Sequence, residues 1–99
     1  MKIMVANGSE FRVPDFILKS IGLSYEEWDD LKFLDFEKNR TDEKIIAVSE
    51  KHPNAIDYAI ITVPDNCQWY IPNEWEDFEV LCWVDENGDL CTFYDGEYH

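Results

Sequence analysis

The hydrophobic positions change their period along the chain, and each period predicts an element. The richest stretch runs from residue 40 to residue 71 and supplies most of the aliphatic surface available for a core. It opens with Thr41 and Asp42, either of which can cap a helix, and Pro53 later disfavours helical continuation. Between these points three aliphatic residues recur at roughly helical spacing: Ile45, Ile46 and Val48. We therefore predict a short helix that ends near His52.

Two strands are predicted after this helix. Residues 58–63 form a β-branched and aromatic run whose length and composition favour a buried strand. The segment 64–66, Pro-Asp-Asn, has the chemistry of a turn. Residues 67–71 then alternate apolar with more polar positions, which is the period of a strand with one buried face. Four side chains on these strands and the next one are expected to be nearly buried: Ile60, Ile61, Trp69 and Val80.

A first β-hairpin is predicted at the start of the chain. Residues 2–6 and 10–13 flank Asn7-Gly8, a pair that favours a two-residue hairpin turn. Pairing across that turn would place Met4 opposite Phe11.

The last third of the chain predicts a second hairpin. Residues 79–84 and 90–94 bracket an acidic turn built on Asn87-Gly88. A two-residue turn there sets a register in which Trp83 and Tyr94 share one face. The other face is apolar throughout and is expected to be core: Val80, Cys82, Val84, Cys91 and Phe93.

Two more helices are predicted between the first hairpin and the central stretch. The first follows a proline suited to the opening helical position and ends at Gly22, a good C-terminal stop. Ser24 and Glu27 form a capping box for the second, which runs over residues 25–36. Residues 38–40 then link it to the central stretch. The second helix should bury one stripe: Trp28, Leu31 and Leu34.

Together these elements predict an α+β fold. It consists of a mainly antiparallel sheet with two Asn-Gly hairpins, packed by two or three short helices. The chain has 99 residues, of which 45% are hydrophobic, so residues 1–99 are expected to form a single domain with one modest core.

The central stretch also resembles a family of small proteins encoded by tailed phages and prophages. Those sequences share an Arg-Thr-Asp start, a short helix with an Ile/Val stripe, a strand ending in Pro-Asp, and a Trp a few residues later. His52-Pro53-Asn54 stands where such proteins usually have Gly. The resemblance implies a phage origin and a bacterial cytoplasm, and it implies no activity. The matching residues are Arg40, Thr41, Asp42, Ile45, Ile46, Val48, Ile60, Ile61, Val63, Pro64, Asp65, Trp69 and Ile71.

The charge of the chain is strongly negative and unevenly placed. Twenty-two acids face eight Lys and Arg residues, for a net charge of -14. Residues 52–99 hold eleven of the acids and neither Lys nor Arg. Such a field repels nucleic acid and acidic membranes and steers basic partners. Two interpretations stay open: a solvated surface that keeps the protein soluble, or a surface that imitates a phosphate backbone.

Neither a metal site nor a cofactor is expected. Asp85, Asn87 and Asp89 match the start of a calcium-loop spacing, but the required Gly and Glu at later positions are missing. The three cysteines form no CxxC pair, and with no signal peptide or membrane-length apolar run they are expected to be reduced core thiols. A catalytic pair of Cys67 with His52 has no support from their spacing.

An interaction surface is the remaining candidate site. Aromatic residues lie among acids in the last third of the chain, a combination that suits an interface with a basic protein. The alternative is that these aromatic residues only cover the edge of the core and bind no partner. The expected partner-binding residues are Glu74, Trp75, Glu76, Asp77, Glu79, Trp83, Asp85, Glu86, Asp89 and Tyr94.

The expected function is therefore non-enzymatic. The sequence favours a phage-encoded acidic protein that occupies the basic nucleic-acid groove of a host defence enzyme, in the manner of anti-CRISPR or anti-restriction proteins. The partner would be a basic host protein, with neither direct nucleic-acid nor membrane binding, and a homodimer stays open. Alternatives are a self-associating protein that sequesters a small signalling ligand, an uncharacterised structural or interaction protein, and a minor enzyme.

Overall fold

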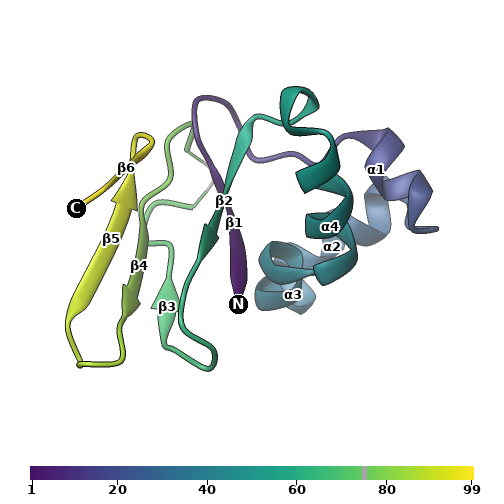
Figure 1. Ribbon diagram of the computed structural model, residues 1–99. Helices are drawn as coiled ribbons and strands as arrows, with labels where there is room; N and C mark the ends of the chain where they lie inside the picture. Colours follow the sequence, from purple (N-terminus) through teal and green to yellow (C-terminus); the bar gives the residue numbers. More distant parts are fainter. Residues whose placement is uncertain (75) are drawn as a thin grey trace. The chain divides into compact units, whose positions relative to one another are not determined.

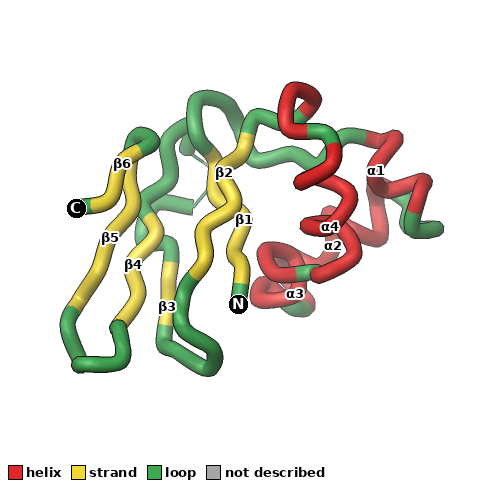
Figure 2. The backbone as a smooth tube through the Cα atoms, in the orientation of Figure 1, coloured by secondary structure: helices red, strands yellow, loops and turns green. Residues whose placement is uncertain are grey.

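The computed structural model describes residues 1–74 and 76–99, and Figures 1 and 2 show its helices and strands. Helices and antiparallel strands occupy separate parts of the chain, so the predicted α+β class is confirmed. The chain divides into two compact units. The first contains residues 1–11 and 57–99 and holds every strand; the second contains residues 12–56 and holds the helices. The expected single domain stays a prediction.

The first unit begins with a two-stranded antiparallel sheet, in which β1 (Lys2–Ala6) pairs with β2 (Tyr58–Thr62). Ile3 lies opposite Ile61 in this register. The prediction that residues 2–6 pair with residues 10–13 was wrong, because residues 10–13 form no strand.

Burial explains the choice of partner for β1. Four consecutive residues of β1, from Ile3 to Ala6, are buried, so both faces of the strand are covered. Residues 10–13 carry Glu10 and Arg12, whose charges would be costly to bury beside such a strand. The run Tyr58–Thr62 contains no charged side chain. The chain therefore closes β1 with a strand that is distant in sequence.

The second sheet of this unit contains β3 (Trp69–Tyr70), β4 (Leu81–Val84), β5 (Leu90–Tyr94) and β6 (Glu97–Tyr98), in that order (Figure 1). All neighbours are antiparallel. The second predicted hairpin is present as β4 and β5.

The predicted register of that hairpin was wrong by one residue, because its loop is longer than a two-residue turn. Val84 pairs with Leu90, and the N–H of Asp85 donates to the carbonyl of Asp89 at 2.9 Å. Gly88 has a φ of +81°, a conformation that glycine adopts at no steric cost. A type I turn followed by such a residue is a common three-residue hairpin loop, with a bulge in place of the shorter turn.

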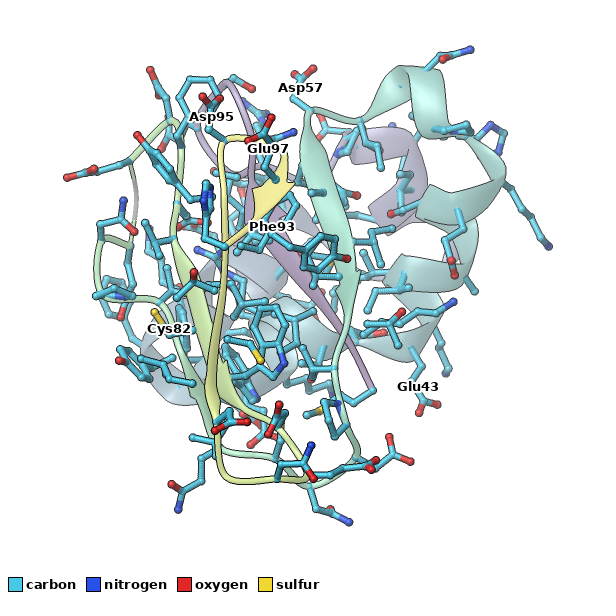
Figure 3. The ribbon with its side chains drawn as sticks, turned by 60° about the vertical axis from the view of Figure 1, so that its left-hand side comes forward. Glu43, Asp57, Cys82, Phe93, Asp95 and Glu97 are labelled. Atoms are coloured by element: carbon cyan, nitrogen blue, oxygen red, sulfur yellow. The ribbon has the colours of Figure 1, made fainter. Side chains whose placement is uncertain are left out.

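The shift reverses which side chains face the core of this unit. Leu81, Trp83 and Phe93 lie on the inner face and are at most 7% exposed. Cys82 lies on the outer face, so Cys82 and Cys91 occupy opposite faces, contrary to the prediction. Figure 3 shows the side chains of Cys82 and Phe93 pointing to opposite sides of the sheet.

The expected core residues are only partly buried. Ile61 is 3% exposed, as expected. Ile60, Trp69 and Val80 are half-buried. Trp69 lies opposite Trp83 and so shares the inner face, but it belongs to β3, a two-residue strand at the edge of its sheet.

The second unit contains α1 (Asp15–Ser20), α2 (Tyr25–Leu34), α3 (Phe36–Thr41), α4 (Glu43–Lys51) and a 3-10 turn, η1 (Pro53–Ala55). The capping box at Ser24 and Glu27 is present. The carboxylate of Asp42 accepts hydrogen bonds from the N–H groups of Lys44 and Ile45, and so caps α4 as predicted. The described helices thus number one more than expected.

The extra helix arises where the second predicted helix breaks. α2 ends at Leu34, and the carboxylate of Asp35 accepts a hydrogen bond from the N–H of Lys38, which starts α3. Leu34 is 81% exposed, so its assignment to a buried stripe was wrong. The expected link at residues 38–40 is instead helical, and it buries Asn39 and Arg40 completely.

Among the described residues, no helix has the length and apolarity needed to cross a membrane.

Candidate interaction surface

Glu79 does not belong to the exposed acidic surface. Its side chain is fully buried, and its carboxylate accepts a hydrogen bond from the N–H of Ala6 at 2.8 Å. The N–H of Glu79 donates to the carbonyl of Ala6 at 3.1 Å. Glu79 therefore joins the end of β1 to the segment before β4 within the first unit, and its assignment as a partner-binding residue was wrong because a buried carboxylate cannot contact a partner.

One of the two expected tryptophan anchors, Trp83, needs revision. Trp83 is 7% exposed and lies on the inner face of the sheet, where its ring packs edge-on against Tyr98 at 6.2 Å. It is a core residue, because the one-residue register shift turns it inward. Trp75 lies outside the described residues.

Asp85 organises the hairpin loop instead of facing solvent freely. It is half-buried, and one of its oxygens accepts from the N–H groups of both Asn87 and Asp89 at 2.9 Å. Its second oxygen lies 3.7 Å from the thiol of Cys91. These hydrogen bonds stabilise the loop, so the first role of Asp85 is to hold the loop conformation and not to bind a partner.

The remaining expected acids are exposed but do not form one group. Glu86 and Asp89 occupy the hairpin loop after β4, whereas Glu74, Glu76 and Asp77 precede the same strand. The N–H of Gly8 donates to the carbonyl of Asp77 at 2.8 Å, which ties this loop to the end of β1. β4 has four residues, so it separates the two groups by about 13 Å at roughly 3.3 Å per residue.

Three further acids are absent from the predicted set: Asp57 directly precedes β2, and Asp95 and Glu97 lie in and after the turn between β5 and β6. Figure 3 shows all three toward the same end of the view. All of them are exposed. Asp95 has a φ of +52° in the turn between β5 and β6, a conformation that Asp tolerates better than most residues.

The outer face of the four-stranded sheet carries large exposed side chains that the sequence reasoning missed, except for Tyr94. Tyr70 is 52% exposed, Leu90 60% and Tyr94 42%. The cross-strand pairs Tyr70 with Cys82 and Val84 with Leu90 put these residues on one face. A correct loop length would have revealed this face from the alternation along β4 and β5.

The charge of the first unit is extreme. Its residues include twelve Asp and Glu and a single base, Lys2, which gives a side-chain charge of -11. Glu86, Asp89, Asp95 and Glu97 make no ion pair within the described part of the chain. Their carboxylates are therefore available to cations from outside.

The thiols of Cys67 and Cys91 lack the lowered pKa of an activated nucleophile. Burial raises the pKa of the Cys67 thiol above its ordinary value. Burial first, and then the negative charge of Asp85, raise the pKa of the Cys91 thiol. A catalytic cysteine needs the opposite shift, since the thiolate is the nucleophile. No cluster of three or more potential metal ligands occurs in residues 1–74 and 76–99.

Comparison of the chain with protein-family models, with curated proteins and with solved structures finds no match in any of the three.

Proposed function

We propose that this chain is a phage-encoded acidic binding protein that acts in the bacterial cytoplasm. It inhibits a host nucleic-acid-handling defence enzyme by placing carboxylates in the enzyme's basic nucleic-acid groove. The observation that carries the proposal is the charge of the first unit: -11, with Lys2 as its one base.

Electrostatics supports this choice of partner. Exposed carboxylates without counterions repel nucleic acid and attract Lys- and Arg-rich surfaces. Grooves that bind DNA or RNA are rich in Lys and Arg, because they must neutralise phosphates. Carboxylates that occupy such a groove exclude the substrate by competition, and inhibition then needs no catalytic residue.

Capture from a bacterial lysate tests the proposal. The immobilised protein is expected to retain a nucleic-acid-binding enzyme at low salt and to release it when double-stranded DNA is added in excess. The purified enzyme should then lose activity on its nucleic acid as this protein is added. Retention of proteins that neither bind nucleic acid nor are released by DNA would overturn the proposal.

A pair of charge-reversal variants sharpens the test. Glu86→Lys with Asp89→Lys should weaken binding to the captured enzyme about tenfold, or about 1.4 kcal/mol. Asp85 is left unchanged, because its carboxylate holds the loop. The loop should therefore fold normally.

The matched control is Glu26→Lys with Asp30→Lys on α2, where both side chains are exposed. This control changes the net charge by the same amount, so it should alter affinity about twofold through the long-range field alone. Equal losses in the two variants would show that only net charge matters, and the groove-filling role of the first unit would then be wrong.

A further inference from the structure

The outer face of the second sheet departs from the usual pattern of a solvated sheet. We call the outer sheet face the set of side chains that the cross-strand pairing places on one side of β3, β4 and β5: Tyr70, Cys82, Val84, Leu90, Thr92 and Tyr94. Antiparallel sheets with one solvated face normally alternate apolar-in with polar-out residues. Here β4 and β5 place no charged side chain on the outer sheet face, and Thr92 is the one polar residue that they contribute.

Three large side chains of this face are open to solvent, while Cys82 between them is 6% exposed. Leu90 is 60% exposed, Tyr70 52% and Tyr94 42%. The inner face of the same strands is closed, since Leu81 is 0% and Phe93 4% exposed. Exposed apolar groups gathered on one rigid sheet face are typical of a surface that a partner covers.

Carboxylates flank the outer sheet face at both ends. Glu86 and Asp89 lie in the loop that joins Val84 to Leu90. At the other end Glu97 lies directly opposite Tyr94 in the β5–β6 pair, and Asp95 follows Tyr94 in the turn. These four rim carboxylates are exposed and form no ion pair within the described residues.

Charge decides between the two occupants that such a face could have. A second copy would bring its own rim of four carboxylates against this one, at a net charge of -14 per chain, and like charges brought together at an interface are unfavourable. A basic protein surface would instead pair with the rim and cover the centre. Tyrosine rings are also suited to stacking by arginine guanidinium groups.

We infer that the outer sheet face is the surface that docks on a basic protein partner, with an arginine-rich patch of that partner lying over Tyr70, Leu90 and Tyr94. The inference rests on the proposed function and names its contact surface. The rim carboxylates accelerate association, and the apolar centre slows dissociation because its contacts exclude water.

An oligoarginine peptide serves as the probe, because it supplies the proposed chemistry without requiring the host enzyme. Titration of the isotope-labelled protein should shift the backbone amide NMR signals of Tyr70, Leu90 and Tyr94. The double variant Leu90→Ser with Tyr94→Ser keeps the charge of the chain, and it should bind the peptide about fivefold more weakly.

The matched control removes exposed apolar groups of comparable size from the second unit. Phe33→Ser with Leu34→Ser alters side chains that are 82% and 81% exposed on α2, and it should leave peptide affinity unchanged within about twofold. An oligolysine peptide of equal length should bind the parent protein more weakly than oligoarginine, because lysine does not stack on tyrosine as a planar guanidinium does.

Equal peptide affinity of the parent and the Leu90→Ser/Tyr94→Ser variant, or NMR shifts confined to other elements, would overturn the inference. So would self-association of the parent protein, measured by sedimentation, that this variant abolishes, because a second copy would then be the occupant. Lysate capture can fail while the Leu90→Ser/Tyr94→Ser variant weakens peptide binding as expected. The outer sheet face is then supported as a docking surface, and only the proposed target enzyme is wrong. If capture succeeds and the variant binds the captured enzyme like the parent, the proposed function stands and this surface is wrong.

Discussion

At the scale of single residues, Glu79 shows how a charged side chain can belong to the interior. The sequence places it among six other acids between residues 74 and 89, and nothing in that context distinguishes it. In the fold its carboxylate meets the N–H of Ala6, a residue more than seventy positions away. A donor contributed by a distant strand cannot be seen in a local pattern, so this burial was not predictable from the sequence.

Replacing Glu79 is expected to destabilise the protein. Glu79→Ala leaves the buried N–H of Ala6 without this acceptor, which should lower the free energy of unfolding by about 1–3 kcal/mol. Glu79→Gln should cost less, because its amide oxygen can still accept. Urea denaturation measures both, with Glu86→Ala as an exposed control expected to change stability by about 0.5 kcal/mol or less. An Ala variant as stable as the control would contradict the role given to this carboxylate.

The thiol of Cys91 should be alkylated slowly, and neutralising the neighbouring carboxylate of Asp85 should make the alkylation faster. Burial and the charge of Asp85 raise the pKa of the Cys91 thiol, so less thiolate is present at a given pH. Asp85→Asn removes the charge and keeps an oxygen for the loop hydrogen bonds. The pH profile of alkylation should therefore move to lower pH in this variant.

The measurement uses iodoacetamide in a background where Cys67→Ser and Cys82→Ala leave Cys91 as the only thiol. Asp95→Asn, a neutralised carboxylate that does not contribute to the shift at Cys91, is the matched control and should leave the profile in place. A profile that moves equally in both variants would show that general charge, and not the contact with Asp85, sets the reactivity.

At the scale of elements, single capping side chains determine where the helices and the hairpin loop begin and end, and so where the predicted boundaries were right or wrong. Caps and stops are local signals, and the box at Ser24 and the cap at Asp42 were both readable from the sequence. Asp35 is equally a local cap, but it sits inside a continuous helical pattern that conceals the break. The predicted length of the hairpin loop was wrong. The carboxylate of Asp85 accepts hydrogen bonds from two N–H groups, which makes a three-residue loop more favourable than the two-residue turn that Asn-Gly suggests.

The register of β4 predicts an order of stability losses for two paired tryptophans. Trp69 and Trp83 lie opposite each other, but Trp83 is 7% exposed while Trp69 is half-buried. Trp83→Ala should cost about 3–5 kcal/mol, as expected for a large buried side chain. Trp69→Ala should cost clearly less, because part of its ring already contacts water. Thermal unfolding of both variants gives the order, and a greater loss at Trp69 would show that the register is misassigned.

At the scale of the whole molecule, charge is the dominant property. Twenty-two acids and eight bases leave a repulsion that folding must overcome, and the first unit bears most of it. Such repulsion acts between exposed groups and is screened by salt. The negative charge that would attract a basic partner therefore lowers the stability of the folded chain when no partner is bound.

Salt should consequently stabilise this protein. Raising NaCl from about 0.01 M to about 0.15 M shortens the Debye length from about 30 Å to about 8 Å, so the melting temperature should increase. Each 1 kcal/mol gained corresponds to about 4–8 °C in a domain of this size. Glu86→Lys with Asp89→Lys, which lowers the repulsion, should show a smaller salt effect. A melting temperature that falls with salt would indicate that favourable ion pairs outweigh the repulsion.

The amino-acid sequence by itself determined the α+β class, the helix caps at Ser24 and Asp42, the existence of the second hairpin, and the acidic character of the last half. Each of these depends on neighbouring residues or on composition alone. Only the tertiary structure decided the partner of β1, the burial of Glu79 and Trp83, and the outer sheet face with Tyr70, Leu90 and Tyr94. The reason is physical: strand pairing joins residues far apart in the chain, and because side chains alternate, a register shift of one residue exchanges the buried face for the exposed one.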